Sequence, residues 1–272
     1  MKTGLDLLAL ASDLGLPLSE ARGLICHGIE RPKEWLIAHD KDLLSLEQSE
    51  RCQTLLRKRA IGEPYAYLVN KQEFYGREFI VSPAVLIPRP DTELLIDSVL
   101  AIYPNNESLQ VIDLGTGSGC IAITLALERS SWQVLATDTS LAAIDIARKN
   151  AINLKAHNVQ FVQSSWWQQI QGRFDLIVSN PPYINKDDEH LCQGDLRFEP
   201  KDALTDHADG LSAFREILAG LAPRAKQAAN VFLEHGYDQA FAVANLLKEN
   251  HLHIVEQKKD FGHQPRLMIA KI

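Results

Sequence analysis

The fold is decided by the stretch Val111-Ile112-Asp113-Leu114-Gly115-Thr116-Gly117-Ser118-Gly119-Cys120. A short apolar run leads directly into closely spaced glycines. This pattern predicts a buried strand, a tight turn and the start of a helix. Glycine tolerates positive φ and lets the backbone approach a ligand closely, so the turn is a candidate cofactor loop.

The next strand pattern, Val134-Leu135-Ala136-Thr137, ends at Asp138. A carboxylate at the end of the second strand can accept hydrogen bonds from both ribose hydroxyls of a nucleoside. The alternative is that Asp138 caps the helix that starts near Ser140.

Two cofactor classes fit such a glycine loop. A dinucleotide favours the spacing GxGxxG, with its pyrophosphate at the helix N-terminus. Here the spacing is GxGxG, and Asp113 stands two residues before the first glycine. A carboxylate there repels pyrophosphate but suits the ammonium group of S-adenosylmethionine. The candidate cofactor residues of the loop are Asp113, Gly115, Thr116, Gly117, Ser118 and Gly119.

From residue 109 onward, strand patterns alternate with helix patterns. This alternation predicts a mostly parallel, doubly wound α/β sheet. Candidate strands are 110–114, 133–137, 159–162, 174–179, 229–234, 252–258 and 266–271, with helices near 119–129, 140–153, 210–222 and 237–250. Only the turn residues Asp260-Phe261-Gly262-His263 separate the last two strands, so we expect the final strand to run antiparallel.

A second candidate site, Asn180-Pro181-Pro182-Tyr183, follows the strand pattern at 174–179. Open α/β sheets bind their ligands at the carboxyl ends of strands. Prolines carry no N–H group, so nearby carbonyls have fewer local partners, and the Asn180 side chain adds another acceptor. With the flat face of Tyr183, these acceptors suit a planar group that bears an NH2. The alternative is a proline-stiffened loop around a packed tyrosine.

Two further stretches near these strand ends are candidates for ligand contact. Trp166, in Ser164-Ser165-Trp166-Trp167, follows the third strand, where an adenine can stack or form hydrogen bonds; the alternative is a core side chain. Residues 184–209 form a long polar connection, and unstructured loops of that length are usually functional.

Residues 1–70 show helical patterns and no strand alternation, so we expect a helical domain there that recognises the substrate. Ser19 is a candidate cap of the second helix, and Pro32 suits the first turn of a third. Ser45-Leu46-Glu47-Gln48 is a candidate capping box, and Gly62 is placed to end that helix.

Residues 71–90 predict a β-hairpin around Gly76-Arg77, followed by a linker. The stretch Leu86-Ile87-Pro88-Arg89-Pro90-Asp91-Thr92-Glu93 is stiffened by proline, and Asp91 is a candidate cap for a helix at 92–101. Arg89 and Glu93 are placed to roof a ligand site, the alternative being a surface ion pair. Residues 91–272 would then form the catalytic domain.

Composition and charge make several classes of partner, metal site and location less probable for this chain. The 272 residues carry a net charge of −7, so no global basic field indicates a nucleic acid, and we expect no DNA partner. The four cysteines lack a CxxC pair, and His251 and His253 lack a third ligand, so we expect free thiols and no metal. No apolar run approaches the roughly 18 residues of a membrane span. Asp6 interrupts the signal-like start, so we expect a cytoplasmic protein.

These motifs together resemble a known family. The glycine loop, Asp138 and Asn180-Pro181-Pro182-Tyr183 resemble a class I (Rossmann-like) S-adenosylmethionine-dependent methyltransferase that acts on an amino nitrogen. Four further segments make the chain similar to the bacterial peptide chain release factor glutamine methyltransferase family (HemK type). They are Phe79-Ile80-Val81-Ser82-Pro83, Leu86 to Glu93, Arg197-Phe198-Glu199-Pro200 and Leu233-Glu234-His235-Gly236.

The resemblance implies methyl transfer to the glutamine side-chain amide of the Gly-Gly-Gln loop in class 1 release factors, by a monomer. It implies that Asn180, Pro181 and Tyr183 are catalytic and that Pro182 joins them in holding the substrate. It also places Asp138, Trp166 and Asn180 at the cofactor. The family usually has an acidic residue where Ser165 stands, which puts a carboxylate contact to adenine in doubt.

Three other functions stay open at this point. A nucleic acid amino-methyltransferase, acting on DNA adenine or rRNA guanine, shares the Asn-Pro-Pro-Tyr motif but should show a basic face or a target-recognition domain. A nicotinamide oxidoreductase conflicts with the glycine spacing and with Asp113. A non-catalytic adaptor can keep the same fold.

Overall fold

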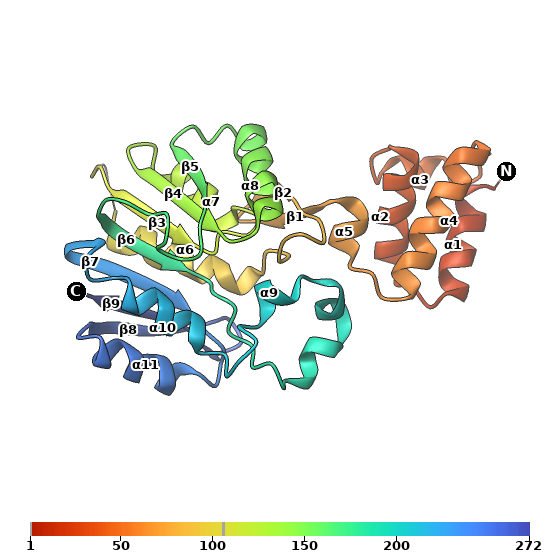
Figure 1. The fold of residues 1–272 in the computed structure, drawn as a ribbon. Helices are drawn as coiled ribbons and strands as arrows, with labels where there is room; N and C mark the ends of the chain where they lie inside the picture. The colour runs from red at the N-terminus through yellow and green to blue at the C-terminus, as the bar shows by residue number, and fades with distance from the viewer. Residues whose placement is uncertain (1, 105–106) are drawn as a thin grey trace. The chain divides into compact units, whose positions relative to one another are not determined.

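The computed structural model describes residues 2–104 and 107–272 of the chain. They form two compact units, Met1–Lys71 and Gln72–Ile272, and each unit has its own hydrophobic core. The first unit is helical, and the second is built around a sheet (Figure 1). None of the helices in the described ranges is long and apolar enough to cross a membrane.

The first unit is built from α1 (Gly4–Asp13), α2 (Leu18–Ile29), α3 (Trp35–Ala38), α4 (Leu46–Ala60) and α5 (Tyr65–Val69). Two of its sequence signals are confirmed. The Ser45 hydroxyl accepts from the Gln48 N–H at 3.1 Å, and the Gln48 side chain accepts from the Ser45 N–H at 3.1 Å, which completes the capping box. Gly62 follows α4 with a φ of +97°, in the left-handed region where glycine ends helices.

Two predicted helix starts in this unit are wrong. The helix α2 begins at Leu18 directly after Pro17, so Ser19 lies inside the first turn and caps nothing. The fixed φ of proline prepares that start without a polar cap. Pro32 precedes α3, whose N-cap position is held by Glu34.

A hairpin of β1 (Lys71–Phe74) and β2 (Arg77–Ile80) follows the helices, and all of it except Lys71 belongs to the second unit. Tyr75 and Gly76 turn it with positive φ angles of 52° and 68°, the conformation of tight hairpin turns.

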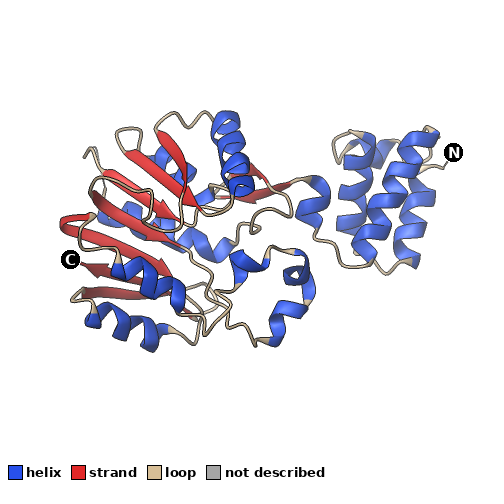
Figure 2. Ribbon diagram, viewed as in Figure 1, coloured by secondary structure: helices blue, strands red, loops and turns tan. Residues whose placement is uncertain are grey.

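Seven strands form the central sheet of this unit, in the order β5-β4-β3-β6-β7-β9-β8. Figure 2 shows the strands of the sheet in red and the helices beside them in blue. They are β3 (Gln110–Leu114), β4 (Gln133–Asp138), β5 (Val159–Gln163), β6 (Phe174–Ser179), β7 (Ala225–Glu234), β8 (His253–Lys259) and β9 (Pro265–Lys271). Every pairing is parallel except those of β9, which runs antiparallel to β7 and β8. The mostly parallel sheet and its reversed last strand are therefore confirmed.

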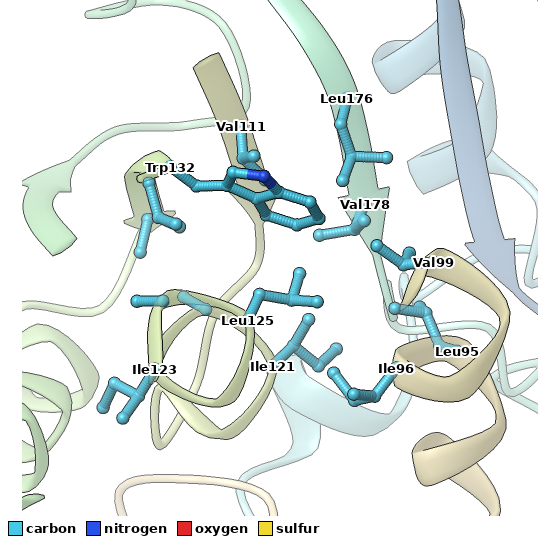
Figure 3. Packing of buried hydrophobic residues seen from close by; sticks show 14 of the residues in the cluster. Leu95, Ile96, Val99, Val111, Ile121, Ile123, Leu125, Trp132, Leu176 and Val178 are labelled. Carbon is cyan, nitrogen blue, oxygen red and sulfur yellow. The ribbon is translucent and has the colours of Figure 1, made fainter. Parts of the chain in front are cut away.

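The helices beside the sheet are α6 (Glu93–Ile102), α7 (Cys120–Glu128), α8 (Leu141–Leu154), α10 (Ser212–Ala219) and α11 (Ala240–Glu249). Successive residues of a strand pack on opposite faces of the central sheet. Val111 packs in one core with side chains of α6 and α7, whereas Ile112 packs in the other with α10 and α11. Figure 3 shows the first core, where the Trp132 ring lies beside Val111, Leu176 and Val178.

One predicted cap in this unit is wrong. Asp91 lies inside a 3-10 turn, η1 (Pro90–Thr92), and α6 follows without a side-chain cap. A capping residue needs an extended backbone. Proline at the first position of the turn instead favours helical geometry. Asp91 lies 3.9 Å from Arg266 Nη2 instead.

Residues 184–209 are not the unstructured loop that the sequence suggested. They contain η2 (Glu189–Cys192), η3 (Gly194–Phe198) and α9 (Lys201–Leu204).

The order of the strands fixes where a ligand can bind. The chain runs from β3 outward to β4 and β5, and then returns to place β6 on the other side of β3. Such a reversal opens a crevice at the carboxyl ends of the two central strands. The glycine loop follows β3 and Asn180 follows β6, so both predicted motifs meet at this point.

Candidate functional site

A cavity of about 550 Å³ lies at the reversal point. Six of the predicted residues line it: Gly115, Gly117, Asp138, Trp166, Asn180 and Pro182. Asn180 also lines a neighbouring apolar cavity of about 80 Å³, which Pro181 and Tyr183 help to form. Asp113, Thr116, Ser118 and Gly119 are predicted residues that line neither cavity.

The glycine loop takes the left-handed backbone conformations that its composition allows. Gly115, Gly117 and Gly119 have φ angles of +78°, +54° and +83°. A Cβ atom added at Gly117 would meet nothing within 4 Å, so conformation and not space demands glycine there. At Gly119 a Cβ would come within 2.7 Å of the Ile123 side chain. The loop therefore needs glycine for two different reasons.

Asp113 is fully buried beside this loop. One carboxylate oxygen accepts a hydrogen bond from the Thr116 hydroxyl at 2.6 Å, while Oδ1 has no partner among the described residues. Burial raises the pKa of Asp113 to about 7, against the effect of the Thr116 hydrogen bond. An acceptor without a donor in the interior is costly unless a ligand supplies one.

Asp138 connects the glycine loop to the second strand. Its carboxylate accepts from the Gly117 N–H at 2.9 Å and from the Ser140 N–H at 2.9 Å. Burial raises its pKa, and these backbone donors act in the opposite direction. The N-cap of α8 is Ser140, which accepts from the Ala143 N–H, so Asp138 is not the helix cap. The carboxylate lines the main cavity.

Trp166 and Trp167 have separate roles. Trp167 is buried in the core and donates to the Ile217 carbonyl at 2.8 Å. Trp166 has a φ of +43°, which is costly for a bulky side chain, and its ring approaches Gly115 at the cavity wall. Strained backbone of this kind concentrates at functional sites.

The Asn180 to Tyr183 segment presents free acceptors. Within the described ranges, neither the Pro181 carbonyl oxygen nor Asn180 Oδ1 takes part in a hydrogen bond. The Asn180 amide nitrogen instead donates to the Thr92 hydroxyl at 3.2 Å. Both free oxygens therefore remain available to a ligand that carries N–H donors.

A buried carboxyl group lies behind this segment. Tyr183 donates to Glu234 Oε1 at 3.4 Å, while Glu234 Oε2 is buried and has no partner among the described residues. Burial raises the pKa of Glu234 to about 7, although the Thr92 hydroxyl, the Arg266 charge and the Tyr183 hydroxyl act to lower it. Arg266 itself is held by Asp260 at 3.1 Å.

The proline-stiffened linker also contributes to the site. Leu86 lines both cavities, and Arg89 forms an ion pair with the fully buried carboxylate of Glu199. Glu199 also accepts from the Ile87 N–H at 2.9 Å, so it holds the linker at two points. Glu93 turns away from the site and accepts from the Tyr75 N–H of the hairpin.

Sequence reasoning missed two parts of this arrangement, Thr92 and Arg266. Thr92 belongs to the stretch that suggested a linker, but its contact to Asn180 spans 88 positions. Arg266 lies on the last strand and carries no motif. Among the described residues, no group of three or more histidine, cysteine, aspartate or glutamate side chains is placed to hold a metal ion.

The chemistry of the donor and acceptor set fits S-adenosylmethionine. Asp138 offers a carboxylate to a ribose, and Trp166 offers a flat wall to an adenine. Asp113 has a buried oxygen without a partner among the described residues, but it lines neither cavity, so its contact with an ammonium group stays a prediction.

Comparisons with known proteins agree with this interpretation of the chemistry. Residues 90–196 match the model of the methyltransferase small domain, and residues 4–69 match that of the PrmC N-terminal domain. The release factor glutamine methyltransferase of Bordetella pertussis is 44% identical over 264 residues, covering 96% of each chain. Its counterpart from Neisseria gonorrhoeae is 45% identical over 259 residues, covering 94% of each chain.

A solved methyltransferase from Pyrococcus furiosus shares the fold, with a TM-score of 0.53 and 19% identity over 82% of this chain and 98% of that one. The protein is thus a class I methyltransferase that depends on S-adenosylmethionine. Identity of this extent over nearly the whole length shows that the chain belongs to the release factor glutamine methyltransferase family.

Proposed function

We propose that this protein methylates the side-chain amide nitrogen of the glutamine in the Gly-Gly-Gln motif of class 1 release factors. The observation that carries the proposal is the pair of free acceptors, Asn180 Oδ1 and the Pro181 carbonyl, at the end of β6. A primary amide offers two N–H donors on one nitrogen, which matches two acceptors. The names of the relatives support the choice of a release factor.

Positioning is the main task of the protein in this reaction. The lone pair of an amide nitrogen is delocalised into the carbonyl, so the nitrogen is a poor nucleophile. Two acceptors on its hydrogens fix the plane of the amide and aim the nitrogen, and such orientation can lower a barrier by roughly 7–11 kcal/mol. The bound cofactor supplies the electrophilic methyl group on its sulfonium. Asn180 and Pro181 also stabilise the positive charge that grows on the nitrogen.

The other site residues support this geometry. Tyr183 covers the face of the amide, and Pro182 stiffens the segment at the wall of the main cavity. We assign Asp138, Trp166 and the glycine loop from Gly115 to Gly119 to cofactor binding, with Asp113 facing its ammonium group. The helices of residues 1–70 carry no chemical motif, and we assign them to recognition of the release factor.

The test is transfer of an isotope-labelled methyl group from S-adenosylmethionine to a purified release factor, followed by mass spectrometry of the labelled residue. A glutamate in place of the substrate glutamine would place its carboxylate oxygens against the acceptors of Asn180 and Pro181. An asparagine is one methylene shorter, so its amide nitrogen would lie farther from the methyl group. Either change should lower the rate at least about a hundredfold. Efficient labelling of these substituted factors, or of DNA without a release factor, would show that the assignment is wrong.

A further inference from the structure

The small cavity beside Asn180 has a cation in its wall. Arg89 lines this cavity together with Asn180, Pro181 and Tyr183, and it is the one charged side chain among the described residues that do so. The rest of the described wall is apolar and consists of Leu86, Ile184, Leu196, Ala203 and Leu204. The charge state of Arg89 therefore bears on which side chains the cavity accepts.

An uncompensated guanidinium would make this cavity a site for carboxylates. The planar fork of arginine matches the two oxygens of a carboxylate, and such charged pairs are the strong hydrogen bonds of proteins. Glutamate and glutamine have the same length and differ in carrying a carboxylate or an amide. A bare Arg89 would therefore favour glutamate, whereas the proposed function requires that the site prefers glutamine.

Glu199 supplies the compensating charge. Its Oε1 accepts from Arg89 Nη2 in an ion pair, and the Glu199 side chain is fully buried. The other oxygen, Oε2, accepts from the Ile87 N–H at 2.9 Å, two residues before Arg89 in the same linker. Because each oxygen has its own donor, the carboxylate is held facing the guanidinium.

The negative charge of Glu199 needs a reason beyond holding the linker. A neutral glutamine could accept the Ile87 N–H equally well through its carbonyl oxygen. Arg89 keeps 33% of its side-chain surface exposed, so water can solvate the guanidinium without a buried partner. Burying a carboxylate for such a pair brings little or no net stability. The charge is explained if Arg89 must not act as a free cation at the cavity.

We propose that Glu199 sets the specificity of the small cavity by neutralising Arg89, so that the cavity takes the uncharged amide of glutamine and not the carboxylate of glutamate. The proposal rests on the proposed function and adds to it a second source of substrate selectivity, besides the acceptors of Asn180 and Pro181. Glu199 touches no reacting atom and acts as a positioning residue through Arg89.

Three variants form a cycle that removes each charge alone and then both together. Glu199→Gln keeps an acceptor for Ile87 and frees the guanidinium of Arg89. Arg89→Met removes the cation and leaves the carboxylate unpaired. The double variant removes both charges. Glu128→Gln is the matched control, because Glu128 pairs with Arg77 at 2.5 Å and neither residue lines either cavity.

The measurement is binding of a whole release factor to the enzyme saturated with S-adenosylhomocysteine, by titration calorimetry at one fixed pH. Each variant is titrated with the factor that carries glutamine in its motif and with the factor that carries glutamate. The readout is the ratio of the two affinities, so a uniform loss of binding or of folded protein cancels. Affinity for S-adenosylhomocysteine is measured separately, as a control on the main cavity.

We expect the preference for glutamine to fall at least about tenfold in Glu199→Gln, the size of one hydrogen bond to a charged group. Arg89→Met should raise the preference by a similar factor, because the unpaired Glu199 then repels a substrate carboxylate. The double variant and Glu128→Gln should stay within about threefold of the wild type, as substitutions without a specific effect usually do.

The cycle separates the charge of Arg89 from a change of shape. An unchanged ratio in Glu199→Gln overturns the proposal. So does a double variant that stays as low as Glu199→Gln, since the loss would then not pass through the guanidinium. Should Glu199→Gln not fold, Arg89→Met decides, and an unchanged or lowered preference for glutamine in it overturns the proposal.

The proposed function and the role of Glu199 can fail separately. If the wild-type enzyme does not methylate the glutamine of the release factor, the proposed function is wrong. If the wild type methylates it but the affinity ratio does not respond to Glu199 and Arg89 as described, only the role in specificity is wrong.

Discussion

Asp113 places a carboxyl group in the interior of the α/β unit, and replacing it with asparagine tests what that burial costs. Burial raises its pKa from 3.8 to about 7. The folded protein therefore binds the proton more tightly than the unfolded chain does, and stability falls as the pH rises between these two pKa values. Asparagine does not ionise, so the variant should lose this part of the pH dependence.

The size of the effect follows from the two pKa values. Each pH unit between them costs about 1.4 kcal/mol, so the ionised carboxyl destabilises the fold by about 4 kcal/mol well above pH 7. At pH 5 less than half of this cost is present, because the pH is then only about one unit above the pKa of the unfolded chain. The free energy of unfolding of Asp113→Asn, relative to the wild type, should therefore rise by roughly 2–3 kcal/mol between pH 5 and pH 8.5.

The assay is urea unfolding at these two pH values, followed by tryptophan fluorescence. Three of the four tryptophans lie in the second unit, and Trp35 is the exception. A Trp35→Phe background therefore restricts the signal to the unit that contains Asp113. Asp145→Asn, on the exposed side of α8, is the matched control for an added amide. Any fixed cost of the new NH2 group in the interior cancels, because only the change with pH is compared.

A single outcome would refute the reasoning. If the stability difference between Asp113→Asn and the wild type is the same at both pH values, the carboxyl is not penalised by burial. The same protein samples also test the ligand role. Loss of the charge should weaken S-adenosylmethionine binding at pH 8.5 in calorimetry, and unchanged affinity would remove Asp113 from the cofactor residues.

Three further predictions concern the proposed site. Asp138→Ala should weaken S-adenosylmethionine binding by up to about 3 kcal/mol, because a charged acceptor is lost; calorimetry that finds unchanged affinity in the folded variant would contradict this. Asn180→Ala should lower the single-turnover rate more than it lowers cofactor affinity, and a near-normal rate would end its assignment to the substrate amide. Deletion of residues 1–70 should leave cofactor affinity nearly intact and lower methylation of the whole release factor, so equal kinetics on that substrate would argue against a recognition role.

The sequence predicts the sheet well because its signals are local. Buried strands are short apolar runs, and the turns between strands and helices carry glycine or proline at fixed places. The carboxyl ends of β3, β4 and β6 can therefore be read directly from the residues that follow them. Their meeting at one crevice then follows from the topology of doubly wound sheets.

The features that the sequence did not predict correctly depend on tertiary contacts or on competing local conformational preferences. Asp91 has the right chemistry for a cap, but Pro90 begins a 3-10 turn before it and removes the extended backbone that a cap needs. The contact between Thr92 and Asn180 joins two segments 88 positions apart, and no spacing rule reaches that far. The left-handed backbone conformation of Trp166 cannot be predicted from the sequence either, because tryptophan does not favour that conformation.

The two buried carboxyl groups, Asp113 and Glu234, lie on strands of the central sheet. Asp113 on β3 and Glu234 on β7 flank β6, and β6 leads into Asn180. Burial raises both pKa values to about 7, and each carboxyl keeps one oxygen without a partner among the described residues. Apolar side chains of similar volume would often be more stable in such positions. Stability alone therefore does not account for these two buried acids.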